Sequence, residues 1–246
     1  MFLTDFHTHF LPDIDDGSPS TDISLEMLKI SANQGVDAII ATPHFYPTEE
    51  DPNSFLQRRI TSVNQLKQYV AIKRSSFRTD PQNSEEIPKL PMIYLGAEVY
   101  YFPTISTCEE LNKLRITGTN LILVELPMIR WNPSLLQEIK AIESNLGLKP
   151  VLAHVDRYAR MMNDPAFFDL AEEYDLLVQV NTSFLLRHED IPYRGCENII
   201  AIGSDCHDTE NRLPNLEEAI YSAGITGGRE WVEDIMSTTA ELLHIS

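Results

Sequence analysis

Two histidines separated by one residue, His7 and His9, lie near the start of the chain. Side chains on an extended strand alternate between its two faces, so both imidazoles would project from the same face. Neutral imidazole is a good ligand for divalent zinc, manganese or iron. Asp205 and His207 repeat this spacing near the other end of the chain. The two pairs together predict a metal site assembled from distant parts of the sequence.

Carboxylate and histidine residues also follow short apolar runs elsewhere in the chain. They are Asp16, His44, Glu98, Glu125 and His154. Short runs rich in β-branched residues and bounded by turn residues are typical of strands buried on both faces. Burying Glu or His is costly unless the group is paired or bound to a metal. Their repetition at the same end of several strands therefore predicts one shared pocket.

Strands and helices alternate along the sequence. Apolar runs predict strands near residues 3–10, 36–42, 92–97, 121–124, 150–153, 176–181 and 198–203. Helical spacing of apolar residues, with start and stop signals at the ends, predicts helices over residues 21–35, 52–72, 133–146, 164–174, 216–223 and 229–243. Such alternation is typical of a parallel α/β fold with right-handed crossovers.

The position of the polar residues distinguishes two α/β architectures. An open doubly wound sheet binds ligands at one switch point between strands. Here the polar residues follow nearly every strand, and only a closed barrel gathers all of those strand ends at one mouth. We therefore predict a TIM-like (β/α)7 barrel, with an open sheet as the alternative.

The length and composition are those of a single domain over residues 1–246. The polar, proline-bearing stretch 74–89 is expected to be an exposed loop or extended tip and not a linker. No apolar stretch is long enough to span a bilayer, and the N-terminus lacks the basic and apolar parts of a signal peptide, so we expect a cytoplasmic protein. The three cysteines (Cys108, Cys196 and Cys206) do not suggest a disulfide framework there.

The formal net charge of −18 argues against a general nucleic-acid-binding protein, which needs a basic surface. An anionic substrate that approaches so acidic a chain needs local positive charge. Bound metal ions would supply that charge at the predicted pocket.

Several blocks of the sequence are similar to one known family. They are HTHFLPDIDDG at residues 7–17, ATPH at 41–44, GAE at 96–98, VELP at 124–127, AHVDRY at 153–158, QVN at 179–181 and SDCH at 204–207. In this order they resemble the polymerase-and-histidinol-phosphatase (PHP) superfamily. More narrowly, they resemble the bacterial manganese-dependent protein-tyrosine phosphatases of capsular and exopolysaccharide biosynthesis.

The resemblance implies a distorted seven-stranded barrel that holds three divalent metal ions at the C-terminal ends of its strands. Manganese is the expected metal, and iron or zinc are alternatives. The implied ligands of the first ion are His7, His9, Glu98 and Asp205. Glu98 would bridge to a second ion, bound also by Glu125 and His154, and the third would be held by Asp16, His44 and His207. Arg157 and Arg212 would bind the substrate phosphate.

The activity that the resemblance implies is hydrolysis of phosphotyrosine by a metal-activated hydroxide. The implied partner is a phosphorylated bacterial tyrosine kinase of polysaccharide export, without nucleic-acid binding or membrane insertion. Two alternatives stay open. One is a histidinol-phosphate phosphatase or another small-molecule phosphomonoesterase, and the other is a metal-binding regulatory protein without catalysis.

A cysteine mechanism is a further possibility, because Cys206 and Arg212 have the spacing of cysteine-dependent tyrosine phosphatases. The loop between them has no glycine and contains two carboxylates, which would repel both a phosphate and a thiolate. Cys206 also alternates with Asp205 and His207, so its thiol should point away from the metal site and into the packing. We therefore expect no cysteine nucleophile.

Three other acidic residues are expected to have supporting roles. Asp5 would lie behind the first histidine pair as a hydrogen-bond partner or a strand-end cap. Asp13 and Asp15 would shape the turn that presents Asp16.

Overall fold

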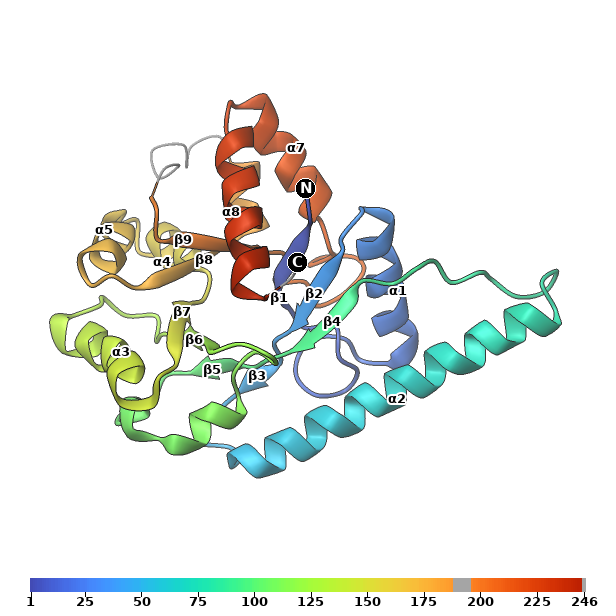
Figure 1. Cartoon of the computed structure of the whole chain (residues 1–246), viewed down its shortest axis with the longest axis horizontal. Coiled ribbons are helices and arrows are strands. Elements are labelled where there is room, and N and C mark those ends of the chain that lie inside the picture. The colour runs from blue at the N-terminus through green and yellow to red at the C-terminus, as the bar shows by residue number, and fades with distance from the viewer. Residues whose placement is uncertain (188–195, 245–246) are drawn as a thin grey trace.

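Parallel strands form the centre of the computed structural model, which describes residues 1–187 and 196–244 (Figure 1). The strands are β1 (Thr4–Thr8), β2 (Ala38–Ala41), β3 (His44–Phe45), β4 (Met92–Leu95), β5 (Glu98–Tyr100), β6 (Leu121–Glu125), β7 (Lys149–Leu152), β8 (Leu177–Asn181) and β9 (Ile199–Gly203). One sheet has the order β1-β2-β4, and the other has the order β3-β5-β6-β7-β8-β9. Every named pair within these sheets is parallel.

The two sheets are joined where two of the predicted strands are interrupted. Thr42 and Pro43 separate β2 from β3, and Gly96 and Ala97 separate β4 from β5. Proline has no N–H to donate to a strand ladder, so a break at Pro43 follows from its chemistry. Hydrogen bonds still cross the break, because Glu98 N donates to the carbonyl oxygen of Pro43 over 3.1 Å. Each interrupted strand therefore continues past its break and delivers a polar residue at the far end.

The barrel closes between β9 and β1. Just past the end of β9, Asp205 N donates to the carbonyl oxygen of His7 over 2.8 Å, and His9 N donates to that of Cys206 over 2.9 Å. With β2/β3 and β4/β5 each counted as one interrupted strand, the closed barrel has the seven strands expected from the sequence. The predicted barrel is confirmed, and the open sheet is excluded.

Helices surround the strands (Figure 1). They are α1 (Thr21–Asn33), α2 (Pro52–Thr79), α3 (Pro133–Leu146), α4 (Val155–Met161), α5 (Ala166–Glu173), α6 (Thr182–Leu186), α7 (Leu216–Ile225) and α8 (Arg229–Leu242), with two short 3-10 helices at Ile105–Thr107 and Glu109–Lys113. Ser20 caps α1 by accepting from Ile23 N. Helix α3 has the predicted bounds, and Gly147 ends it in the left-handed conformation with φ 69°. In the described residues no helix is long and apolar enough to cross a membrane.

Two hydrophobic layers are separated by the strands. On β6, Leu121 and Leu123 pack with Phe6 and Val151, whereas Ile122 belongs to a larger cluster that includes the buried residues of α3. This alternation follows from the period of two along a strand. It fixes which side chains face the barrel interior and which face the helices.

Helix α2 corrects one expectation. The stretch 74–89 was expected to be an exposed loop or extended tip, but its first residues are helical, because α2 continues through Thr79 and the non-helical segment begins at Asp80. A mostly exposed helix needs no apolar stripe at its end, so its polar residues did not reveal it. The chain leaves the helix immediately before Pro81, where the proline ring disfavours helical geometry at the preceding residue.

Candidate metal centre

Seven of the nine predicted ligands lie at or after the C-terminal end of a strand, and His44 and Glu98 lie just past the breaks in the two interrupted strands. His7 is in β1, and His9 and Asp16 follow it. The others come from later strands: His44 from β3, Glu98 from β5, Glu125 from β6, His154 after β7, and Asp205 and His207 after β9. The structure thus brings together residues that are up to two hundred positions apart in the chain.

Glu98 lies at the centre of this group and is almost completely buried. Its Oε2 lies 3.0 Å from His7 Nε2, 3.3 Å from His9 Nε2 and 3.2 Å from His44 Nδ1. Its Oε1 lies 2.8 Å from His154 Nε2. A carboxylate whose two oxygens face different histidines has the arrangement of a group that bridges two ions.

Asp205 lies beside His7 and His9. Its Oδ1 is 3.6 Å from His7 Nε2 and 3.5 Å from His9 Nε2. Asp205 and His154 both have positive φ, 54° and 35° respectively. Such backbone conformations cost an ordinary residue on the order of 1–3 kcal/mol and are concentrated at functional sites. Here they occur where the chain leaves a strand and turns its side chain into the centre.

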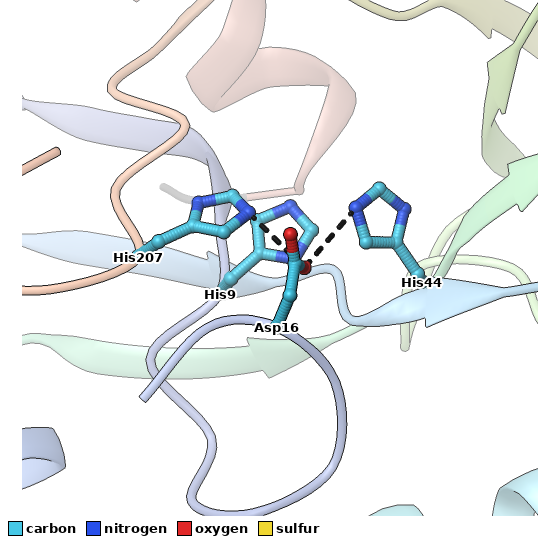
Figure 2. Close-up of side chains that lie close together, drawn as sticks. All are labelled: His9, Asp16, His44 and His207. Carbon is cyan, nitrogen blue, oxygen red and sulfur yellow. Dashed lines mark ion pairs between the residues drawn. The ribbon is translucent and has the colours of Figure 1, made fainter. Parts of the chain in front are cut away.

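Asp16, His44 and His207 form a second group at the exposed edge of the centre (Figure 2). Asp16 Oδ1 lies 3.4 Å from His207 Nε2 and 3.6 Å from His44 Nε2. His9 stacks on His207 with 4.0 Å between ring centroids. His44 also faces the inner group, because its Nδ1 lies 3.2 Å from Glu98 and 3.9 Å from Glu125. Its ring therefore lies between the two groups.

The donor atoms fit divalent metal ions. Ligands about 2.1 Å from one ion lie about 3.0–3.4 Å apart in tetrahedral or octahedral geometry, and the inner contacts cluster in this range. The facing Nε2 atoms of His7 and His9, 3.0 Å apart, suit a shared ion in particular. Buried ring nitrogens of His44, His154 and His207 have no hydrogen-bond partner within the described residues. Imidazole and carboxylate together suit manganese, iron or zinc.

Two histidines carry a proton in the metal-free chain. Burial alone would lower the pKa of His9, but hydrogen bonds and charge from Asp15 and Glu98 raise it to about 10. Burial is likewise outweighed at His154, where Glu125 and Glu98 raise the pKa to about 9. Burial would raise the pKa of Glu98, but the charge of His7 and hydrogen bonds from His154, His7 and His9 hold it well below its usual range. The centre without metal is a network of buried ion pairs.

Two other histidines are neutral near pH 7. Burial lowers the pKa of His44 and brings that of His207 to about 4, and the positive charge of His9 adds to both shifts. Their lone pairs are therefore available at neutral pH. Neutral imidazole is the form that binds a metal.

Both predicted phosphate-binding arginines lie at the centre. Arg157 is in α4, one turn after His154, and its guanidinium contacts Asp205 Oδ2. Arg212 Nη2 lies 2.8 Å from the same oxygen. The loop that carries Arg212 is held by Asp208, whose Oδ1 accepts hydrogen bonds from three consecutive backbone N–H groups, including that of Arg212 over 3.0 Å. The two guanidinium groups are thus positioned beside the candidate ligands.

Three supporting residues differ from expectation. Asp15 was expected only to shape the turn, and it does accept from Gly17 N; its Oδ2 also lies 2.7 Å from His9 Nδ1. Gln179, to which no role was assigned, has its Oε1 3.1 Å from His7 Nδ1 and 2.8 Å from His154 N. Asp5 accepts from Ser204 N over 2.8 Å and thereby holds the backbone just before Asp205. For the contact between Asp15 and His9, the only signal in the sequence was the position of Asp15 in the acidic turn that follows His9.

Tyr46 is a further residue at the site that the sequence did not single out. Its ring stacks on His44 with 5.1 Å between centroids and an interplanar angle of 22°. It lines a cavity of about 550 Å³ whose other lining residues include Asp16, His44 and Arg58. This cavity gives the candidate centre an open approach.

Cys206 has the surroundings expected of a packing residue. Its side chain is fully buried within the main hydrophobic cluster, and burial raises the pKa of its thiol. A nucleophilic cysteine needs an accessible thiolate with a lowered pKa. The geometry therefore excludes the cysteine mechanism.

Comparison with known proteins agrees with this geometry. Tyrosine-protein phosphatase CpsB of Streptococcus agalactiae serotype V is 26% identical over 243 residues, covering 88% of both chains. Tyrosine-protein phosphatase YwqE of Bacillus subtilis is 25% identical, covering 98% of this chain and 91% of its own length.

A solved structure also matches. It comes from a study of YwqE of Bacillus subtilis and CpsB of Streptococcus pneumoniae, described as unique metal-dependent tyrosine phosphatases. The TM-score is 0.77 at 22% identity, over 99% of this chain and 95% of the other, which shows a common fold. The family model for capsular polysaccharide synthesis, CpsB/CapC, matches residues 3–244. With nearly its whole length matched, the chain belongs to the CpsB/CapC family.

Proposed function

We propose that the protein is a metal-dependent phosphatase that hydrolyses phosphotyrosine in proteins. The observation that carries the proposal is the convergence of nine histidine and carboxylate side chains around Glu98, with Arg157 and Arg212 at the same edge. Positive charge beside potential metal ligands suits a phosphate group. The relatives named tyrosine-protein phosphatases support the choice of phosphotyrosine.

We propose three divalent ions, with manganese as the first choice and iron or zinc as alternatives. His7, His9, Glu98 and Asp205 would hold one ion, Glu98, Glu125 and His154 a second, and Asp16, His44 and His207 a third. When bound, the ions supply an acidified water as the nucleophile and positive charge for the phosphate oxygens.

The arginines would act directly on the phosphate. In the metal-free chain both guanidinium groups are bound to Asp205, which the proposal assigns to a metal. Once that carboxylate is engaged, the guanidinium groups are free to donate to the equatorial oxygens and to stabilise their charge. The leaving phenol has a pKa of about 10, so its departure needs little help from a general acid. Replacing Arg157 or Arg212 with alanine should lower kcat/KM about 100-fold.

The test compares substrates and metals in one protein. Hydrolysis of a phosphotyrosine peptide should stop after treatment with a chelator and return with Mn²⁺, and metal analysis should find three ions per chain. A variant with His7→Ala and His9→Ala should lose both metal and activity, whereas Cys206→Ser should retain them. Faster turnover of histidinol phosphate than of the peptide would contradict the proposed substrate. Full activity without metal would contradict the mechanism.

The proposed physiological substrate is a phosphorylated tyrosine kinase of polysaccharide export. The family description, capsular polysaccharide synthesis, supports this choice. The cytoplasmic location expected from the sequence stays a prediction, and it matches the compartment in which such a kinase would be phosphorylated by ATP.

A further inference from the structure

Helix α2 is basic in an otherwise acidic chain. Its 28 residues include six of the 19 lysines and arginines and no aspartate or glutamate, although the net charge of the chain is −18. The outer half of α2, together with the segment that returns from its end, extends away from the body of the protein (Figure 1). The basic residues of this outer half do not line the cavity at the proposed metal centre, which Arg58 lines from the other end of the helix.

The same half of α2 borders an apolar cavity of about 540 Å³, which we call the α2 groove. Leu28 of α1 and Val63 and Leu66 of α2 form buried parts of its lining. Val70 of α2 and Ile93 of β4 continue the apolar lining toward solvent, and Ile93 is 39% exposed. The apolar lining of the groove therefore runs from the buried core to the solvent-exposed surface of β4.

Lys67, Arg74 and Arg78 line this groove and are exposed to solvent. Among the described residues none of them forms an ion pair, and the ion pair that α2 does form, Arg58 with Glu50, lies at its other end. Some cations elsewhere on the surface are paired, as Lys140 is with Asp175, whereas Lys113 and Arg115 also form no ion pair among the described residues. An apolar lining bordered by unpaired positive charge is complementary to a ligand that is both apolar and acidic.

We propose that the α2 groove docks an acidic amphipathic helix of a partner protein. The α2 residues that line it run from Val63 to Arg78, which spans about 22 Å of helix, or about four turns of an occupant lying alongside. Apolar residues of the occupant at i, i+3, i+4 and i+7 would fill the cavity, and its carboxylates would meet Lys67, Arg74 and Arg78. A membrane-binding helix instead presents a protruding apolar face, whereas this face is hollow. The proposal holds whatever the metal centre hydrolyses.

The test is a selection from a displayed random library of peptides of about 16 residues, with the whole chain immobilised. Enriched peptides should be acidic, with apolar residues at helical spacing. Their binding, measured by fluorescence anisotropy, should weaken about tenfold or more in the variant Lys67→Glu/Arg74→Glu/Arg78→Glu. The matched control, Lys113→Glu/Arg115→Glu/Arg229→Glu, changes the net charge equally outside the groove and should bind as the unmodified chain does.

Two further measurements keep the proposal testable if the variant is unstable. In the unmodified chain, the bound peptide should slow hydrogen exchange between residues 63 and 78, and salt should weaken its binding. Hydrolysis of p-nitrophenyl phosphate should be equal in both variants, because the groove is not part of the metal centre. Enrichment of basic peptides, or equal binding to both variants, would overturn the proposal. So would binding of anionic phosphatidylglycerol vesicles alone, or a dimer of the chain that the groove variant abolishes.

Discussion

The rings of His7 and His9 are each held by a hydrogen-bond partner on the side away from Glu98. Asp15 lies against Nδ1 of His9, and Gln179 lies against Nδ1 of His7, so that both Nε2 atoms face Glu98. A hydrogen bond to the far nitrogen fixes the orientation of an imidazole and raises its basicity. These partners therefore set the geometry of the centre before any ion arrives.

Asp15→Asn should weaken metal binding about 10- to 100-fold with little change in fold, because it removes the charge behind His9 and leaves the side-chain shape intact. Competition with a metal-binding dye would measure the affinity. Asp13→Asn is the matched control, since Asp13 is exposed on the same turn. An equal loss in both variants would show that the turn, and not the contact to His9, is responsible.

Metal binding should release protons. The pKa values of about 10 for His9 and about 9 for His154 mean that both rings carry a proton at pH 7 in the metal-free chain. Each must lose its Nε2 proton to bind an ion, so the apparent affinity for Mn²⁺ should rise with pH between about pH 6 and pH 8. Calorimetry in buffers of different ionisation enthalpy would count the protons, and a buffer-independent heat would contradict this assignment.

The same raised pKa values affect the metal-free fold. The protonated rings of His9 and His154 stabilise the folded metal-free chain. This stabilisation is fully present below about pH 6.5, the ordinary pKa of histidine, and is lost as pH rises through about 9 to 10. The metal-free chain should therefore become less stable toward pH 10.

At the scale of elements, the closure of the barrel depends on one close approach. A Cβ on Gly203, at the end of β9, would lie 2.5 Å from His7 Cβ and 2.8 Å from His7 N. Only a residue without a side chain lets β9 lie this near to β1. The contact that closes the barrel thus also positions a candidate ligand.

Gly203→Ala should destabilise the protein by about 1–3 kcal/mol, because the backbone of β1 cannot move aside without disturbing its own pairing. Gly224→Ala is the control, since a Cβ there has no neighbour within 4 Å and its φ is not positive. It lies in α7, where alanine should stabilise by about 0.5–1 kcal/mol. Denaturant unfolding would measure both, and a neutral Gly203→Ala would contradict the close approach.

The sequence predicted the elements better than their interruptions. Apolar runs located all seven strands, and polar residues after them located the nine converging side chains. The break at Pro43 was not foreseen, since a run of apolar residues does not show where a ladder is interrupted. The contact of Gln179 with His7 joins residues 172 positions apart, and no local pattern encodes such a pair. The outer end of α2 was missed because exposed helices have no apolar signal.

At the scale of the whole molecule, acidic and basic regions are separated. The candidate metal centre gathers carboxylates that an ion would neutralise, while Lys67, Arg74 and Arg78 of α2 line the groove. Lys29 of α1 pairs with Glu85 and so attaches the segment after α2 to the body. A second ligand surface can therefore act without disturbing the first.

The outer end of α2 also divides the candidate ligands into two sets. His7, His9, Asp16 and His44 precede it in the chain, and the other five follow it. Arg78 and Lys89 are exposed on either side of this excursion, so brief trypsin treatment should cut there first. The parallel pairing of β2 with β4 and of β3 with β5 would hold the two fragments together. The nicked protein should elute as one species and still hydrolyse phosphotyrosine: a continuous polypeptide is dispensable at this point, and the enzyme would persist as two complementary fragments.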